Sequence, residues 1–197
     1  MRIAVLALQG AFAEHERMVR ALGAECFEIR QHADWARPKD GLIIPGGEST
    51  TMLRLLADLC LLAPVRQAIA GGLPVFGTCA GLILLAKEVD GEASERLSTM
   101  DIRVRRNAYG RQLGSFRADI DMAEVGSGVP ATFIRAPYIE AVSGRARALA
   151  TVDGHIVAAR QDNQLATAFH PELNDDLRVH QYFLRMVAKS QELATGV

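Results

Sequence analysis

Residues 74–87, with the sequence PVFGTCAGLILLAK, predict a short strand, a sharp turn and a helix in direct succession. The apolar run that ends at Gly77 is typical of a strand covered on both faces. Cys79 follows it in a G-x-C-x-G pattern, the thiol form of the G-x-S-x-G turn that exposes a nucleophile between a strand and a helix. A strand that passes directly into a helix is the building unit of a parallel sheet, so this stretch predicts an α/β fold.

The chain on the N-terminal side of this stretch shows the same alternation of strands and helices. Strands are predicted at residues 3–8, 25–30 and 41–44, and helices at residues 12–22 and 49–71, with Ser49 or Thr50 as N-cap and Pro64 dividing the second helix. This order implies a mixed, mostly parallel sheet with helices on both faces. We therefore expect a three-layer α/β/α sandwich.

The C-terminal half has a different pattern, in which short strand-like runs are separated by turns. Such runs lie at residues 102–104, 115–120, 132–134, 155–159 and 165–169. They favour antiparallel additions to the sheet, with loops at residues 92–99 and 122–130. A last helix is predicted to begin near Asn174 or Asp175. Because no linker or repeat interrupts the pattern, we expect a single domain over residues 1–197.

The charge balance and the cysteines argue against several classes of protein. The 197 residues carry 22 Lys and Arg against 23 Asp and Glu, a net charge of −1, so nucleic-acid binding is not favoured. Three cysteines without a CxxC pair favour neither a disulfide framework nor a zinc site. Residues 67–86 are uncharged over the length of a membrane span, but glycines and Pro74 interrupt them. With no signal-peptide pattern at the start, a soluble cytoplasmic protein is expected.

Cys79 is the candidate nucleophile. A helix that begins at Ala80 directs its free N–H groups towards the sulfur and favours the thiolate, and the Ala80 N–H could also donate to an oxyanion. The alternative is a buried structural cysteine, but the glycines on both sides of Cys79 would pack a core poorly. Cys26 lies in a strand pattern and Cys60 lies among leucines, so both are expected in the core.

His170 is the leading candidate for the base that such a nucleophile needs. It follows the apolar run 165–169, and strand ends in parallel sheets face the ligand crevice. In an extended step Glu172 would point the same way as His170 and could orient the imidazole. Alone, this tripeptide is a weak signal, and a chance loop remains the alternative. His15 and His180 lie on predicted helices and are expected to be satisfied surface or interface histidines.

The loop at residues 45–50, with the sequence PGGEST, ends a strand and begins a helix. Its two glycines permit close approach of the backbone to a ligand, so an N–H here could be a second oxyanion donor. A tight turn with a capping hydroxyl and a phosphate site are the alternatives, although the Walker pattern is absent. Arg135 follows a strand-like run, and a buried guanidinium in that position would need an anion partner.

Five motifs together resemble the glutaminase subunits of pyridoxal 5′-phosphate synthases, a branch of the class I (triad) glutamine amidotransferases. They are Leu8-Gln9-Gly10, Pro45 to Thr51, Arg105 to Gln112, Phe133 to Pro137, and Ala168 to Glu172, and the Gly77 to Gly81 turn is shared with the class as a whole. The resemblance covers residues 3 to about 187. It implies the flavodoxin-like class I glutamine amidotransferase fold.

The resemblance also implies an activity, the hydrolysis of L-glutamine to L-glutamate and ammonia through a glutamyl thioester. It implies a triad of Cys79, His170 and Glu172, and oxyanion donors at the N–H groups of Gly47 and Ala80. The positions that would bind glutamine are Gly47, Glu48, Ser49, Arg106, Ile134 and Arg135. No metal and no cofactor is expected in this chain.

A partner is implied as well. In the family that this chain resembles, a (β/α)8-barrel synthase subunit takes up the ammonia and makes pyridoxal 5′-phosphate from ribose 5-phosphate and glyceraldehyde 3-phosphate, usually in a 12 + 12 assembly. Gln9 and the loop at Gly46 and Gly47 would lie near that interface.

Three other hypotheses remain. A DJ-1-like protein also places a reactive cysteine on such a turn, but His170, Glu172 and the Gly-Gly-Glu-Ser loop favour the amidotransferase. An imidazole-glycerol-phosphate-type glutaminase is the nearest alternative within the class, and the motifs 105–112 and 133–137 argue against it. The third hypothesis, a binding subunit without activity, is disfavoured because Cys79, His170 and Glu172 are all present.

Overall fold

The computed structural model describes residues 1–106 and 114–196, and within the last helix it leaves the side chains of residues 194 and 195 undescribed. The helices are α1 (Phe12–Ala21), α2 (His32–Trp35), α3 (Ser49–Asp58), α4 (Leu62–Ala70), α5 (Ala80–Leu85), the short 3-10 turn η1 (Pro171–Leu173) and α6 (Arg178–Thr195). The strands are β1 (Arg2–Leu6), β2 (Glu25–Ile29), β3 (Gly41–Ile44), β4 (Val75–Thr78), β5 (Ala86–Val89), β6 (Met100–Arg105), β7 (Ser115–Met122), β8 (Gly126–Ile134), β9 (Tyr138–Val142), β10 (Arg147–Val152), β11 (His155–Gln161) and β12 (Gln164–Thr167).

The strands form one large mixed sheet in the order β2-β1-β3-β4-β12-β11-β9-β6-β5, with β10 paired to β11. Strands β2, β1, β3, β4 and β12 run parallel to their neighbours in this order. Strand β11 joins β12 and β9 in antiparallel fashion. The mixed sheet, largely parallel in its N-terminal half, confirms the fold class expected from the alternating pattern.

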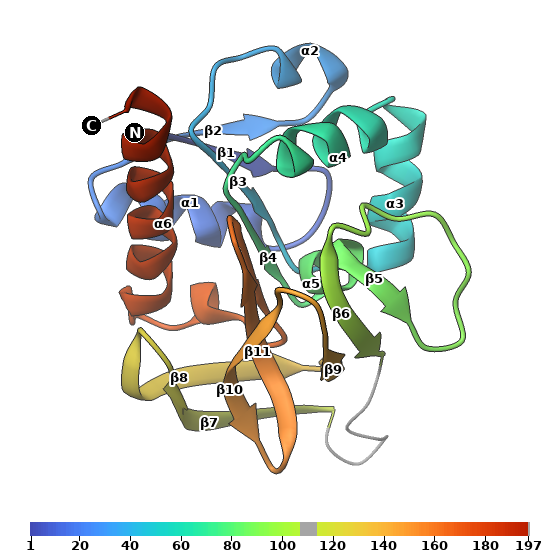
Figure 1. The fold of residues 1–197 in the computed structure, drawn as a ribbon, viewed down its shortest axis with the longest axis vertical. Helices are drawn as coiled ribbons and strands as arrows, with labels where there is room; N and C mark the ends of the chain where they lie inside the picture. Colours follow the sequence, from blue (N-terminus) through green and yellow to red (C-terminus); the bar gives the residue numbers. More distant parts are fainter. Residues whose placement is uncertain (107–113, 197) are drawn as a thin grey trace.

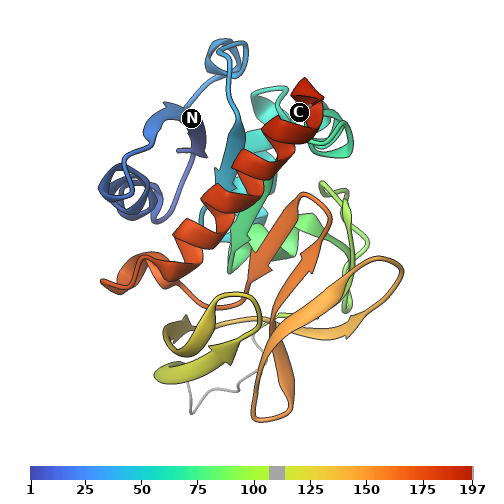
Figure 2. The same ribbon diagram turned by 60° about the vertical axis from the view of Figure 1, so that its left-hand side comes forward.

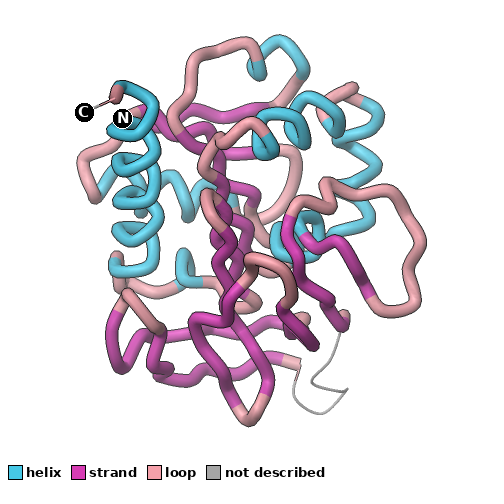
Figure 3. The backbone as a smooth tube through the Cα atoms, viewed as in Figure 1, coloured by secondary structure: helices cyan, strands magenta, loops and turns pink. Residues whose placement is uncertain are grey.

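Helices cover both faces of the parallel half of the sheet. Figures 1 and 2 show α1 and α6 on one face and α3, α4 and α5 on the other, which gives the expected three layers. The secondary-structure colouring of Figure 3 separates this helix-rich half from a lower part built almost entirely from strands and loops. Because helices cover these strands on both faces, all four residues of β3 and of β4 are buried.

The pairing of β4 with β12 decides where the candidate site lies. Thr78 at the end of β4 and Thr167 at the end of β12 are far apart in the chain, yet they are register partners in a parallel ladder. A candidate residue follows each strand, Cys79 directly after β4 and His170 shortly after β12. Since parallel neighbours end at the same edge of the sheet, the fold brings the two residues together.

The C-terminal half contains more strands than the sequence patterns predicted. The expected loop at residues 122–130 is wrong, since it includes the end of β7 and the first residues of β8, from Gly126 onwards. These two strands form a separate two-stranded sheet rather than an addition to the main one. Polar and glycine residues in this hairpin hid the strand pattern, because backbone pairing does not require apolar side chains on an exposed face.

Several helix boundaries also differ from the predictions. Glu48, not Ser49 or Thr50, caps α3, and its carboxylate accepts the N–H groups of Thr50 and Thr51 at 3.1 and 2.7 Å. Pro64 lies inside the first turn of α4, where its missing N–H costs nothing, so the break falls before it at residues 59–61. Helix α6 begins at Arg178 rather than near Asn174 or Asp175, because η1 ends at Leu173 and residues 174–177 connect it to the helix without helical structure.

Two of the cysteines do not lie where the pattern placed them. Cys60, expected in the core, is exposed in the turn between α3 and α4, and Cys26 on β2 is only partly buried. Cys79 alone is buried. Leu61 beside Cys60 is fully buried, but the turn directs the side chain of Cys60 itself to solvent.

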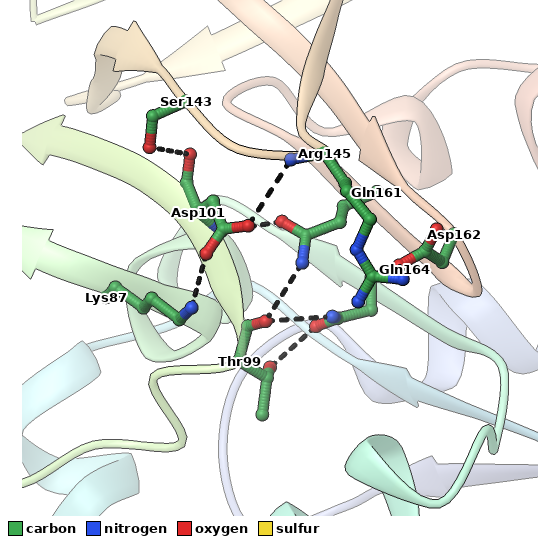
Figure 4. A network of polar contacts seen from close by, with 8 residues as sticks. All are labelled: Lys87, Thr99, Asp101, Ser143, Arg145, Gln161, Asp162 and Gln164. Atoms are coloured by element: carbon green, nitrogen blue, oxygen red, sulfur yellow. Dashed lines mark hydrogen bonds and ion pairs between the residues drawn. The ribbon is translucent and has the colours of Figure 1, made fainter.

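A polar network fastens the edge strands to the middle of the sheet (Figure 4). The Asp101 N–H on β6 donates to Gln161 Oε1 at 2.6 Å, and the Asp101 carboxylate forms an ion pair with Lys87 on β5. Gln164 Nε2 on β12 donates to the Thr99 carbonyl at 3.0 Å. These contacts link β5 and β6 to β11 and β12.

Candidate active site

Cys79 sits on a strained turn between β4 and α5. Its backbone has φ 49° and ψ −100°, and it is the N-cap residue of α5. The Cys79 N–H donates to the Thr167 carbonyl at 2.8 Å, which ties the turn to β12. A Cβ at Gly81 would lie 2.2 Å from the Ile44 carbonyl oxygen, so only glycine lets α5 pass so close to β3. The G-x-C-x-G pattern therefore produces the predicted turn.

His170 and Glu172 form the contact that the sequence predicted. His170 Nδ1 lies 2.7 Å from Glu172 Oε1, and the Glu172 side chain is fully buried. The geometry is not the extended step that was expected, because Pro171 begins the short turn η1. The His170 N–H donates to the Thr132 carbonyl of β8 at 2.8 Å, which fixes the start of this turn.

The electrostatics of this pair favour a charged imidazole. Burial lowers the pKa of His170, but its hydrogen bonds with Cys79 and Glu172 outweigh burial and raise the pKa to about 10. Burial likewise raises the pKa of Glu172, but the neighbouring His15 and His170 outweigh it and bring the pKa below its usual value. The arrangement holds an imidazolium between the Cys79 sulfur and the Glu172 carboxylate at neutral pH.

The loop at residues 45–50 packs directly against His170. A Cβ at Gly46 would lie 2.3 Å from His170 Cε1 and 3.3 Å from the Cys79 Cβ, so a side chain there would displace the catalytic candidates. The Glu48 N–H donates to Gln9 Oε1 at 2.8 Å, which anchors the loop to the segment after β1. The sequence pointed to this loop but not to the role of Gly46 as space for the imidazole.

Cys79 and His170 open into a pocket of about 450 Å³. It is lined by Gln9, Gly47, Glu48, Ser49, Cys79, Ile83, Arg106, Ile134, Arg135, Pro137 and His170. All six positions proposed for glutamine binding therefore line one pocket together with the sulfur and the imidazole. Glu172 and Ala80 lie behind this wall and are buried.

The two arginines of the pocket have different surroundings. Arg106 forms an ion pair with Glu92 and lies 3.4 Å from Glu48 Oε1 through its Nη2. Arg135 is exposed, with φ 42°, so its guanidinium does not need the anion partner that a buried one would require. Its exposed position at the pocket leaves it accessible to a ligand carboxylate. Residues 107–112 of the Arg105 to Gln112 motif lie outside the described residues.

Two histidines behind the pocket have a role that the sequence did not indicate. His15 on α1 and His180 on α6 are both fully buried, not surface or interface residues. His15 Nε2 lies 3.5 Å from Glu172 Oε2 and 3.1 Å from Thr78 Oγ1, and His15 Nδ1 lies 2.9 Å from His180 Nε2. Nothing in the helical spacing of either residue signals this cluster, because it joins helices 165 positions apart.

Neither a metal centre nor a membrane-spanning helix is found in the part of the chain that the structure describes. Residues 1–106 and 114–196 contain no group of three or more His, Cys, Asp or Glu side chains arranged to hold a metal ion. Within the same ranges, no helix has the length and apolar character required to cross a membrane.

Comparison with known proteins places this architecture among glutamine amidotransferases. The model of the SNO glutamine amidotransferase family matches residues 5–189. A protein of Carboxydothermus hydrogenoformans called pyridoxal 5′-phosphate synthase subunit PdxT is 55% identical over 190 residues, covering 96% of this chain and 99% of that protein. The protein of the same name from Methanocorpusculum labreanum is 59% identical over 188 residues, covering 95% and 98%.

A solved structure supports the same assignment. It is described as the crystal structure of glutamine amidotransferase, with a TM-score of 0.89 and 41% identity over 94% of this chain and 98% of that one. The family model, the relatives and the shared fold agree over nearly the whole length. This chain is thus a member of the SNO glutamine amidotransferase family.

Proposed function

We propose that this chain hydrolyses L-glutamine to L-glutamate and ammonia, with Cys79 as nucleophile, His170 as general acid and base, and Glu172 as the residue that orients His170. The observation that carries the proposal is the position of a cysteine and a His–Glu pair at the ends of β4 and β12, side by side at one pocket. The membership in an amidotransferase family supports the same chemistry.

The proposed reaction has two halves. The Cys79 Sγ attacks the side-chain amide carbon of glutamine, and the N–H groups of Gly47 and Ala80 stabilise the oxygen that becomes negative. His170 gives its proton to the amide nitrogen, and the C–N bond breaks. Ammonia departs, and a γ-glutamyl thioester remains on Cys79. His170 then takes a proton from water, whose oxygen attacks the thioester and releases glutamate and the free cysteine.

The pocket offers both charges that a free amino acid needs. The guanidinium groups of Arg106 and Arg135 suit the α-carboxylate of glutamine, and Glu48 suits its α-ammonium group. Burial opposes ionisation of Glu48, but the N–H groups of Thr51 and Thr50 outweigh burial and lower the pKa of this carboxyl. Ser49 and Ile134 complete the walls on either side. This arrangement favours a small zwitterionic substrate over a peptide or a nucleotide.

We further propose that the ammonia passes to a (β/α)8-barrel synthase subunit that makes pyridoxal 5′-phosphate from ribose 5-phosphate and glyceraldehyde 3-phosphate, in a 12 + 12 assembly. The support is the name of the relatives, pyridoxal 5′-phosphate synthase subunit. Gln9, which holds the Glu48 N–H, belongs in this proposal to the region that the partner contacts. The cytoplasm is the proposed location, since all three cysteines are free thiols and suit a reducing compartment.

The test is the release of ammonia and glutamate from L-glutamine, measured for this chain alone and with a barrel synthase subunit. We expect turnover that the partner strongly increases and that asparagine does not support. Turnover without any effect of the partner would retain the glutaminase and refute the proposed partner. No turnover in either mixture would contradict the proposed activity and favour a reactive-cysteine protein of the DJ-1-like type.

A trapping experiment tests the covalent step separately. A glutamine analogue with a diazoketone in place of the amide should alkylate Cys79, and peptide mass spectrometry should find the adduct there. Adducts at Cys26 or Cys60 instead would contradict the assignment of the nucleophile.

A further inference from the structure

The cluster of His15, His180 and Thr78 lies beneath the pocket and does not line it. Phe76 on β4 packs against both imidazoles, with ring centroids 5.9 Å from His15 and 5.6 Å from His180. The rings are therefore fixed between β4, α1 and α6. Two buried imidazoles are costly in a core, so their contacts with the active site need an explanation.

Glu172 is the point where this cluster meets the active site. Its Oε1 is 2.7 Å from His170 Nδ1, whereas its Oε2 is buried, lacks a hydrogen bond among the described residues, and lies 3.5 Å from His15 Nε2. A buried carboxylate with one oxygen unpaired is strongly disfavoured as an anion. The nearby imidazole is thus positioned to offset that cost.

The protonation of the cluster can be worked out from its contacts. Burial lowers the pKa of both His15 and His180, so both rings are neutral and each has a single N–H. A bare ring nitrogen facing Glu172 Oε2 would repel the carboxylate, so the proton of His15 belongs on Nε2. His15 Nδ1 then accepts the N–H of His180 Nε2 at 2.9 Å.

This assignment also explains the far end of the cluster. It leaves His180 Nδ1 without a proton, and that atom is buried and has no hydrogen-bond partner among the described residues. The opposite assignment would bury an unpaired N–H there, which is rarer in proteins than an unpaired acceptor. The Nε2–H of His15 points to Thr78 Oγ1, which is 3.1 Å from Nε2, and to Glu172 Oε2, which is 3.5 Å from it.

We propose that His15, held in one orientation by His180 and Thr78, is a positioning residue that keeps Glu172 ionised and aligned beneath His170. This proposal rests on the glutaminase function proposed above and adds to its triad a residue that supports Glu172 from behind. Two groups face the Glu172 carboxylate. They are His170, which directly precedes η1, and His15 on α1, and His180 on α6 lies behind His15. Arg17 on α1 approaches Glu172 only at its backbone carbonyl, to which Nη2 donates at 3.4 Å, and its other partner is Asp175.

Two near-isosteric variants separate a positioning role from a packing role. His15→Gln can place an amide N–H close to the position of Nε2, whereas His15→Asn retains a group only at the position of Nδ1. Val19→Ala, in the same helix and fully buried, is the matched control, because it weakens packing without touching Glu172. Thermal unfolding of each variant reports how much packing it has lost.

The measurements are kcat and KM for glutamine with the synthase partner, and the pH profile of iodoacetamide alkylation at Cys79. In His15→Asn we expect kcat to fall about tenfold with little change in KM. The midpoint of the alkylation profile should rise by about one pH unit, because a less favoured Glu172 anion stabilises the His170 cation less. His15→Gln should remain close to wild type in both measurements, and Val19→Ala should show neither effect.

Wild-type kcat and an unshifted profile in His15→Asn would overturn the proposal. Equal impairment of the Gln and Asn variants, or a similar shift in Val19→Ala, would overturn it too, because these results indicate packing alone. Alkylation does not require glutamine turnover. A wild-type chain without glutaminase activity would therefore refute the proposed function, while the alkylation profiles would still test His15.

Discussion

Two turns of this molecule place a cysteine in the left-handed region of backbone space, and only one of them forms a site. Cys60, between α3 and α4, has φ 54°, and Cys79, between β4 and α5, has φ 49°. Cysteine rarely adopts either conformation, because its Cβ crowds the backbone there. Backbone strain by itself therefore does not distinguish a nucleophile from an ordinary surface residue.

The turn at Cys60 ends a helix. The Cys60 N–H donates to the Ala57 carbonyl at 3.0 Å, and the Leu61 N–H donates to the Leu56 carbonyl at 2.8 Å. These two bonds form a Schellman motif, in which glycine usually takes the left-handed position. Leu61 is fully buried, so the motif serves to return the chain to the core. The thiol faces solvent at the negative end of the helix dipole.

The turn at Cys79 begins a helix, and its neighbours come from distant parts of the chain. Its N–H is held by Thr167, and its side chain shares the pocket with His170. The positive end of the α5 dipole points at the sulfur, and the imidazolium of His170 adds a full charge. What a strained cysteine does therefore depends on which end of a helix it occupies and on the partners that the sheet brings to it.

The two turns should differ most in catalysis. Cys79→Ser should lower glutamine turnover by about 10⁴-fold or more, because the weaker nucleophile cannot form the thioester. Cys60→Ser should leave turnover within about twofold of wild type, since no catalytic group lies near it. Ammonia release with the synthase partner measures both. Retained activity in Cys79→Ser would show that the two turns do not differ in chemistry.

The second prediction removes the carboxylate that holds His170 without touching the cysteine. Glu172→Gln should lower turnover by about 10²- to 10⁴-fold, because the neutral amide no longer stabilises the His170 cation. The pKa of His170, which is about 10 in the intact site, should fall. Steady-state rates between about pH 6 and pH 10 give the first quantity, and NMR titration of the His170 ring gives the second. An unchanged His170 pKa would contradict the orienting role of Glu172.

A third prediction concerns the reactivity of the two thiols in one sample. Between about pH 8 and pH 6 the imidazole of His170 stays protonated, because its pKa of about 10 lies above this range. The ratio of iodoacetamide alkylation at Cys79 to that at Cys60 should therefore rise by about tenfold as the pH falls through this interval. Peptide mass spectrometry resolves the two sites. A constant ratio would show that His170 does not distinguish them.

A much weaker effect is expected on stability. Cys60→Gly should raise the free energy of unfolding by about 0.5–1 kcal/mol, because glycine removes the left-handed strain at the end of α3 without loss of buried area. Urea unfolding measures the change, and glutamine turnover should not alter. The same substitution at Cys79 should abolish turnover. A destabilised Cys60→Gly variant would mean that Cys60 makes favourable contacts that its exposed position does not suggest.

Much of the candidate site could be predicted because its signals are local in the chain. The turn at Cys79 depends on two glycines within two residues of it, and the His170–Glu172 contact joins residues two positions apart. Interpretations that depended on distant packing failed more often. Cys60 was expected in the core and residues 122–130 were expected to be a loop. Both expectations were inferred from neighbouring residues, whereas the surroundings of Cys60 and the pairing of β7 with β8 are set by the folded chain.

The amino-acid sequence alone specifies the alternation of strands and helices, the strained cysteine turn and the short His–Glu segment, since periodicity and glycine placement act through neighbouring torsions. The packing of the folded chain, in contrast, sets β4 beside β12, which brings Cys79 to His170, and uses α1 and α6 to bring His15 and His180 beneath Glu172. No local pattern reveals these contacts, because a buried polar group is stabilised by whatever partner the packing supplies. That partner can come from any part of the chain.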